Sequence, residues 1–263
     1  MVPTLTLVNL IISVVLILGS PIVVFYLFRS KKEVFRTMAA GAMGFFIAQY
    51  VIRLPILNSL LSLSTTRLIL DNVWLYAIVL GFSAALFQFI LRIVILKWFM
   101  SGSQQKHHVI SAGFGHGVLE AIFLVAIPHL NSIFLSIMIN NNRISELFSD
   151  TADPNVVNQI IEGFVNANSW IFLMSGIERI MVVFIQIAIT ILVFKGLQDR
   201  SNRMKHWGKA LLIHTSFEFI IILLQLNSAS LWIIEPVVLL FMVASIFIIK
   251  EFYIQNSEVI ESE

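Results

Sequence analysis

The stretch TLTLVNLIISVVLILGSPIVVFYLF, residues 4–28, contains no charged side chain. A helix rises 1.5 Å per residue, so roughly 20 apolar residues cross the 30 Å hydrocarbon core of a bilayer. This stretch is long enough to do so. It has no basic segment before it and is too long for a cleavable signal peptide, so we expect it to remain as a membrane anchor.

Six more apolar runs of similar length follow along the chain. With the first, the predicted spans are 4–28, 36–57, 73–99, 109–139, 169–194, 208–227 and 231–254. The whole chain is 58% hydrophobic and 12% charged, with a mean hydropathy of +0.92. This composition is too apolar for one soluble domain of 263 residues. The sequence therefore predicts an all-α, polytopic helical bundle forming one integral membrane domain over residues 1–254.

The positive charges between the spans predict the orientation of the chain. One set of loops and span ends holds twelve Lys and Arg residues, whereas the other set holds Arg67 and Arg143. The basic side of a membrane protein faces the cytoplasm, so we expect an external N-terminus and a cytoplasmic C-terminus. The twelve basic residues are Arg29, Lys31, Lys32, Arg36, Lys97, Lys106, Lys195, Arg200, Arg203, Lys205, Lys209 and Lys250. We expect a multi-pass protein of the cell membrane, specifically of a bacterial cytoplasmic membrane.

The sequence also predicts the structure of three further segments. Pro128 lies inside the fourth span and predicts a kink or a re-entrant piece. Residues 143–168 are predicted to form an external loop in which VVNQIIEGFV makes a helix on the membrane surface. Residues 255–263 are predicted to be a cytoplasmic tail. The chain has no cysteine, which excludes disulfides and thiol chemistry, and it shows no nucleic-acid-binding pattern.

Two copies of the pattern His-x-x-x-Glu lie inside the apolar spans. His116 and Glu120 belong to the fourth span, and His214 and Glu218 belong to the sixth. A spacing of four places both side chains of a pair on one helix face. Counted from the cytoplasmic end, the histidines lie about six or seven residues deep and the glutamates about ten or eleven. The two pairs are therefore expected at matching depth in the membrane.

Other ionisable residues share this depth. Arg92 lies in the third span, with Gln88 one turn away, and Glu178 and Arg179 lie in the fifth span. Charged groups at the bilayer centre cost about 2.5–3.5 kcal/mol each, so they normally face the bundle interior and pair. One interpretation is a structural network in which Arg92 and Arg179 neutralise glutamates. Arg53 lies outside this depth and is interpreted as structural, as is Glu235.

A chemical interpretation is supported by three glycines around the first pair, Gly113, Gly115 and Gly117, which allow close approach of another helix or a substrate. The set His116, Glu120, His214 and Glu218 has side chains that suit a divalent metal such as Zn²⁺. Without a metal, a buried carboxylate could act as a general base towards water, with histidine stabilising the oxyanion. Both routes lead to amide hydrolysis within the membrane, and both remain open from the residues.

The ordered segments resemble a known family. GHGVLEAI (115–122), SGIERIMVVF (175–184), LLIHTSFEF (211–219) and FFIAQYVIRLPIL (45–57) are similar to segments of the YhfC-type intramembrane proteases of the glutamic type. These are distant relatives of the CAAX-prenyl-protease and bacteriocin-processing superfamily. The resemblance runs from about residue 40 to 225. It implies site roles for Arg92, His116, Glu120, Glu178, Arg179, His214 and Glu218.

The chain departs from the family pattern at the expected bases. The resemblance implies an EExxR motif in the third span, but LFQFILR stands here, with Gln88 and Phe89 in place of the glutamates. A histidine expected in the fifth span is Gln186, and an aspartate expected in the sixth is Glu218. Glutamine cannot accept a proton as a base. Glu120, Glu178 or Glu218 would have to take over that role.

Three functional hypotheses follow. The first is an intramembrane peptidase acting on a membrane-bound peptide or protein, with Glu120 or Glu218 as base and Arg92 and Arg179 orienting carboxylates. The second is a catalytically silent relative that binds membrane peptides in bacteriocin immunity or regulation. The third is a transporter that uses the same cluster for protons or cations. Substrate, metal dependence and oligomeric state leave no mark in the sequence.

Overall fold

The computed structural model describes residues 1–28, 32–63, 67–99, 106–148 and 153–255. Within these ranges every regular element is a helix and no strand is formed, so the all-α prediction is confirmed. Arg29, Lys31 and part of the predicted external loop, 149–152, lie outside the described residues. The predicted tail 255–263 also lies outside them, apart from Gln255.

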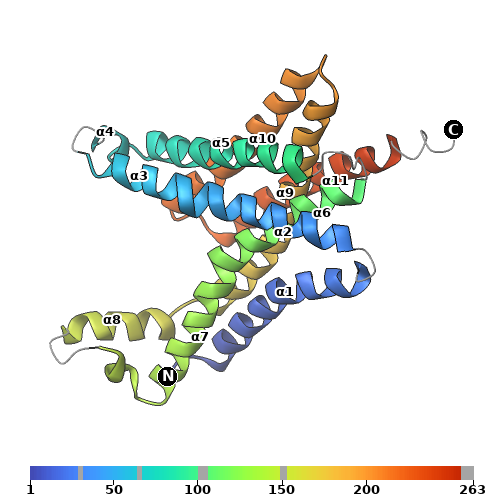
Figure 1. The fold of residues 1–263 in the computed structure, drawn as a ribbon. Coiled ribbons are helices and arrows are strands. Elements are labelled where there is room, and N and C mark those ends of the chain that lie inside the picture. Colours follow the sequence, from blue (N-terminus) through green and yellow to red (C-terminus); the bar gives the residue numbers. More distant parts are fainter. Residues whose placement is uncertain (29–31, 64–66, 100–105, 149–152, 256–263) are drawn as a thin grey trace. The chain divides into compact units, whose positions relative to one another are not determined.

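Figure 1 shows the order of the helices along the chain. The elements are α1 Thr4–Phe28, α2 Lys32–Phe46, η1 Ile47–Arg53, α3 Leu54–Leu61, α4 Arg67–Leu70, α5 Val73–Phe99, α6 Lys106–Ala121, η3 Ile122–Ala126, α7 Ile127–Asn140, η4 Ile144–Leu147, α8 Pro154–Val165, α9 Ser169–Gln198, α10 Arg203–Leu226 and α11 Leu231–Gln255.

Seven helical segments in the described ranges are long and apolar enough to cross a membrane, which confirms the predicted number of spans. They are Thr4–Leu27, Glu33–Leu61, Val73–Trp98, Lys106–Asn140, Ser169–Gln198, Arg203–Leu226 and Leu231–Ile254. Their ends differ from the predicted ends by about five residues at most, because capping and polar residues extend helices beyond the apolar runs. The protein is a multi-pass membrane protein. Its orientation in the bilayer stays a prediction.

Two spans change helix type in front of a proline. The π-helical segment η1 precedes Pro55 at the start of α3, and η3 precedes Pro128 at the start of α7. The proline ring clashes with the carbonyl four residues earlier in an α-helix, and the wider π turn relieves this clash. The irregularity predicted near Pro128 takes this form, and the helix continues beyond it. The matching change before Pro55 was not predicted.

The contacts of the chain divide into two compact units. Unit 1 comprises residues 1–24 and 121–180, and unit 2 comprises residues 25–120 and 181–263. Unit 1 therefore takes most of α1, the elements η3 to α8 and the first part of α9. Unit 2 takes the remaining helices. The prediction of one membrane domain over residues 1–254 stays a prediction.

In unit 1, the amphipathic helix predicted within the loop 143–168 is formed as α8. Asp153 caps it, accepting a hydrogen bond from the Asn155 backbone N–H at 2.9 Å. Its apolar side chains Val157, Ile161 and Phe164 pack against a cluster of Val2, Ile139 and Ile144. This packing explains the spacing of the apolar residues in α8. Its placement on the membrane surface stays a prediction.

In unit 2, glycines allow helices to approach closely around the predicted site. A Cβ atom on Gly113 would lie 2.7 Å from Ile187 Cα, and one on Gly117 would lie 3.0 Å from Val183 Cα. A Cβ atom on Gly115 would collide with the backbone of Met38. The α6 glycines thus face α9 on one side and α2 on the other. The α5 and α10 helices also run alongside each other in unit 2 (Figure 1).

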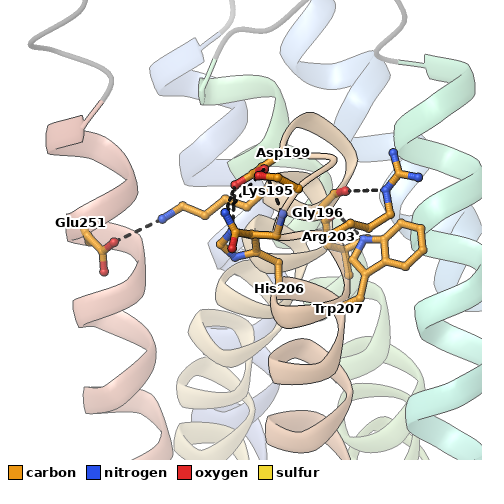
Figure 2. Close-up of polar contacts among 10 residues, drawn as sticks. Lys195, Gly196, Asp199, Arg203, His206, Trp207 and Glu251 are labelled. Carbon is orange, nitrogen blue, oxygen red and sulfur yellow. Dashed lines mark hydrogen bonds and ion pairs between the residues drawn. The ribbon is translucent and has the colours of Figure 1, made fainter.

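The turn between α9 and α10 is fixed by polar contacts (Figure 2). Trp207 Nε1 donates to the Val193 carbonyl at 3.1 Å, and Arg203 Nε donates to the Gly196 carbonyl at 3.1 Å. Lys195 Nζ lies 3.3 Å from Glu251 Oε1 on α11. Because these contacts tie the ends of α9, α10 and α11 together, they limit how far the helices that carry Gln186 and His214 can slide.

Candidate functional site

The first His-x-x-x-Glu pair is held by a glutamine from the neighbouring helix. His116 on α6 is buried, and its Nε2 lies 2.8 Å from Oε1 of Gln88 on α5. The ring of Phe45 packs edge-on against the imidazole, with centroids 5.3 Å apart. One turn along α6, Glu120 is 2% exposed. Both side chains therefore lie in the interior of unit 2.

Gln186 bridges an arginine and a glutamate in the same interior. Its Nε2 donates to Glu120 Oε2 at 2.6 Å, and its Oε1 accepts a hydrogen bond from Arg92 Nη2. All three side chains are buried, and they come from α9, α6 and α5. The sequence identified Gln186 as a departure from the family pattern and not as a site residue. Its amide is nevertheless the link between the two charged groups.

The histidine of the second pair is not hydrogen-bonded in the way that His116 is. His214 Nε2 lies 3.7 Å from Glu218 Oε1, beyond hydrogen-bond length. Neither ring nitrogen of His214 has a hydrogen-bond partner within the described chain, although the side chain is 1% exposed. Glu218 is 20% exposed, against 2% for Glu120. The pair His214–Glu218 therefore combines open, buried ring nitrogens with a partly accessible carboxylate.

Electrostatic interactions join the two pairs into one group in unit 2. The Arg92 guanidinium interacts with the carboxylates of Glu120 and Glu218, and with both imidazoles, His116 and His214. Two cations thus act on Glu218, because the Arg53 guanidinium interacts with it too. The structure therefore brings together five of the predicted site residues: Arg92, His116, Glu120, His214 and Glu218.

Arg53, interpreted as structural from the sequence, does hold two elements together. Its Nε donates to Ser83 Oγ at 3.0 Å, and its Nη2 donates to the Leu80 carbonyl at 2.8 Å. These bonds tie η1 to α5. The Arg53 guanidinium also interacts electrostatically with Glu218. The predicted depth of Arg53 in the membrane did not indicate this interaction.

A cavity of about 10 Å³ lies beside Arg92, lined also by His116, Thr190, Gly41 and Gly44. The Nε and Nη1 atoms of Arg92 are buried without a hydrogen-bond partner in the described chain. A cavity of this size holds about one water molecule. It is too small for a substrate.

The other two predicted site residues belong to unit 1. Glu178 and Arg179 are neighbours on the first part of α9, and an Arg179 Nη2 hydrogen bond to Glu178 Oε1 pairs them. Both are largely buried, with side chains about one tenth exposed. The structure thus shows this arginine neutralising its own neighbour. A role for the pair in the site of unit 2 stays a prediction.

A model of the YhfC intramembrane metalloprotease family matches residues 13–239. The chain belongs to this family. The resemblance to the YhfC-type family found in the sequence is thereby confirmed, although the family description names a metalloprotease and the resemblance implied a glutamic-type protease. A Bacillus subtilis (strain 168) protein, described as an uncharacterized membrane protein YhfC, is 25% identical over 146 residues, which cover 54% of each chain. The chain spans about half the length of this curated relative. No solved structure matches the chain.

The family's description implies a metal ion, and the residues present can be tested for fit. A catalytic zinc ion takes three protein ligands and a water molecule. Within the described residues, no three His, Asp or Glu side chains are grouped so that they could hold a metal ion. As arranged, the predicted set of His116, Glu120, His214 and Glu218 is not grouped closely enough to hold a metal ion.

Proposed function

We propose that this chain is an intramembrane peptidase that hydrolyses a peptide bond of a membrane-embedded peptide or protein. Membership of the YhfC intramembrane metalloprotease family supports the reaction class. The observation that carries the assignment of the site is the His214–Glu218 pair, with open ring nitrogens beside a partly exposed carboxylate. Buried polar atoms normally have partners, and those of His214 would acquire theirs from water or substrate.

Glu218 is the general base in this proposal. It removes a proton from a water molecule while the water oxygen bonds to the carbonyl carbon of the scissile peptide. The C–N bond then breaks, and the proton passes from Glu218 to the leaving amine. Glu120 suits this task less well because it is buried and already accepts a hydrogen bond from Gln186. Its greater exposure therefore favours Glu218.

The neighbouring residues stabilise charge during the reaction. His214 donates a hydrogen bond to the oxyanion that develops on the substrate carbonyl. Arg92 and Arg53 balance the charge of the Glu218 carboxylate through their electrostatic interactions with it. Gln88 and Phe89 take no part in proton transfer. The Gln88 amide cannot accept a proton as a base, and Phe89 is buried with its ring edge-on to Trp207 at 5.7 Å.

The test compares two glutamates of the site. The full chain is reconstituted in liposomes with quenched-fluorescence transmembrane peptides, and cleavage is compared among wild type, Glu218→Gln and Glu120→Gln. Loss of a general base lowers the rate by about 10²–10⁴-fold, and we expect this loss for Glu218→Gln. Glu162→Gln, an exposed position on α8, is the matched control. Full activity of Glu218→Gln would refute the assignment of the base. Absence of cleavage by wild type across the peptides would refute the peptidase.

A further inference from the structure

The first turns of α10 present two lysines on one exposed face. Lys205 and Lys209 are both exposed, and their spacing of four places the two ammonium groups one turn apart on the same side of the helix. Neither side chain has a hydrogen bond or an ion pair within the described chain. Lys195 differs from them, because it pairs with Glu251 on α11 (Figure 2). The positive charge of the two α10 lysines is therefore available to a partner.

Apolar side chains border the two lysines along the same face. Met204 is 77% exposed and Leu212 is 68% exposed. Gly208 lies one turn from each of them and is exposed too. A Cβ atom placed on Gly208 would meet nothing within 4 Å. The face thus has a gap in its row of side chains, with an apolar side chain on either side of the gap along the helix.

Both features weaken α10 when the helix is considered by itself. Like charges at a spacing of four repel each other, and a glycine inside a helix is less favourable than an alanine. Gly113 on α6 is explained by close packing, since its Cβ would lie 2.7 Å from Ile187 Cα, but Gly208 has no such neighbour in the described chain. A chain that departs from local preference without an internal contact in return is expected to do so at a functional surface.

The position of this face points to the lipid bilayer. The segment Arg203–Leu226 is long and apolar enough to cross a membrane. Lys205 and Lys209 lie in its first two turns, where a span meets the layer of phospholipid headgroups. A lysine at this depth keeps its apolar stem along the helix and extends its ammonium group to the headgroups.

The charges around the face favour an anionic headgroup. No acidic residue lies between residues 203 and 217. The carboxylate that precedes them, that of Asp199, already accepts hydrogen bonds from Ser201 and Asn202. A lipid phosphate is attracted by both lysines. A zwitterionic headgroup carries an ammonium group as well, which the lysines repel, so a lipid with a net negative charge fits better.

We propose that this face of α10 binds a phospholipid with a net negative headgroup. The phosphate lies between the ammonium groups of Lys205 and Lys209. One acyl chain lies over Gly208 and contacts Met204 and Leu212. The binding uses none of the residues assigned to peptide hydrolysis, so it is tested independently of the proposed peptidase.

The first experiment measures lipid binding to the full chain, purified in detergent and stripped of lipid, by native mass spectrometry. The probes are phosphatidylglycerol and phosphatidylcholine with identical acyl chains. We expect wild type to bind phosphatidylglycerol at least about fivefold more tightly. Each lysine near an anionic headgroup contributes a factor of about five, so Lys205→Gln/Lys209→Gln should weaken phosphatidylglycerol binding about 25-fold.

Two control variants accompany this measurement. Lys97→Gln/Lys250→Gln removes the same charge from exposed lysines on α5 and α11, and should leave the affinity for phosphatidylglycerol close to that of wild type. Lys205→Arg/Lys209→Arg keeps the charge of the face and should retain binding, which separates a lost charge from a lost fold. Equal losses in the two glutamine variants would overturn the proposal, as would equal affinities of wild type for the two lipids.

The second experiment tests the contact with the acyl chain. Gly208→Leu fills the gap and keeps both lysines, and no atom near its Cβ obstructs the new side chain. We expect phosphatidylglycerol binding to weaken about fourfold or more, the factor for one buried methylene group, without a fall in melting temperature. Gly163→Leu on α8, whose Cβ also meets open space, is the matched control and should bind as wild type does.

Inorganic phosphate serves as a competitor in the same measurement. It has no acyl chain, so at millimolar concentration it should leave phosphatidylglycerol bound. Displacement of the lipid by phosphate, or unchanged binding in Gly208→Leu, would show a site for small anions and would overturn the proposed lipid site.

Discussion

Each unit of the protein buries a histidine among polar side chains, and the two histidines differ in how fully they are bonded. In unit 1, His129 Nδ1 lies 3.0 Å from Ser13 Oγ, and its Nε2 lies 3.2 Å from Ser175 Oγ. In unit 2, both ring nitrogens of His214 lack a hydrogen-bond partner within the described chain. A histidine whose two ring nitrogens are both hydrogen-bonded cross-links helices. A histidine whose ring nitrogens have no partner can still form a hydrogen bond with a substrate.

The network around His129 leaves no proton free for chemistry. Ser175 Oγ donates to the Phe172 carbonyl at 3.0 Å, so it accepts from His129 Nε2. His129 Nδ1 then accepts from Ser13, and the chain of bonds is closed. It joins α1, α7 and α9. The site in unit 2 differs by including the carboxylates of Glu120 and Glu218.

The largest expected difference between the units is in catalysis. His214→Ala should lower peptide cleavage by about 10²-fold or more, since a hydrogen bond to the oxyanion is lost. His129→Ala should leave the cleavage rate of folded protein unchanged. Proteoliposome assays on the two variants, corrected for the folded fraction, measure this contrast. Equal losses in both variants would show that bonding state does not distinguish a functional histidine from a structural one.

The next effect is on stability and concerns the bridging amide. Gln186→Leu leaves the Arg92 Nη2 and Glu120 contacts of Gln186 unmade, and each unsatisfied buried group costs about 1–3 kcal/mol. We expect a clear fall in thermal stability. Ser13→Ala removes one neutral hydrogen bond in unit 1 and should cost about 1 kcal/mol. Thermal unfolding in nanodiscs compares them. A milder effect for Gln186→Leu than for Ser13→Ala would argue against the network as described.

A smaller contrast comes from one glycine in each unit. A Cβ on Gly113 would lie 2.7 Å from Ile187 Cα, so Gly113→Ala should destabilise unit 2 by about 1–3 kcal/mol through overpacking. A Cβ on Gly163 in α8 would meet nothing within 4 Å. Gly163→Ala should therefore stabilise α8 by about 0.5–1 kcal/mol, because alanine favours the helix. Melting temperatures that shift in the same direction for both variants would contradict this account.

The smallest effect is a pH dependence at the turn between α9 and α10. Hydrogen bonds from Ser201 and Asn202 hold the pKa of Asp199 below its ordinary value. A lowered folded pKa gives stability above the unfolded pKa, about 3.9, and that stability is lost as the pH falls through the folded pKa. Wild type should melt slightly higher than Asp199→Asn at pH 6, and the difference should shrink below about pH 4. A difference that grows on acidification would contradict the assignment.

The sequence predicted the spans well because a span depends on a sum over many residues. Apolar stretches of about 20 residues form helices in a bilayer whatever their detailed order. The π segments before Pro55 and Pro128 depend on local backbone hydrogen bonds, to which hydropathy is insensitive. Pro21 and Pro236 lie inside α1 and α11 without such a segment, so proline alone does not predict one.

The polar group in unit 2 was predictable in its ionisable members and not in its neutral link. Arg92, Glu120, His116, His214 and Glu218 stood out because charged groups in a span need partners. Gln186 is neutral, and its significance depends on contacts between helices that sequence spacing does not give. The signal available in the sequence was Gln186 itself, because a glutamine is unusual in a strongly apolar span. Glu178 and Arg179 lie at the expected place in α9 but belong to the other unit.

The π segment before Pro55 also changes which side chains of the second span lie on the same face of the helix. A π turn accommodates one more residue than an α turn, so side chains beyond η1 are rotated relative to those before it. A helical wheel drawn through the whole span would assign the wrong lipid-facing positions after Arg53. A tryptophan scan of residues 40–61 should therefore show two periodic patterns of tolerance that are out of phase, with the break inside η1.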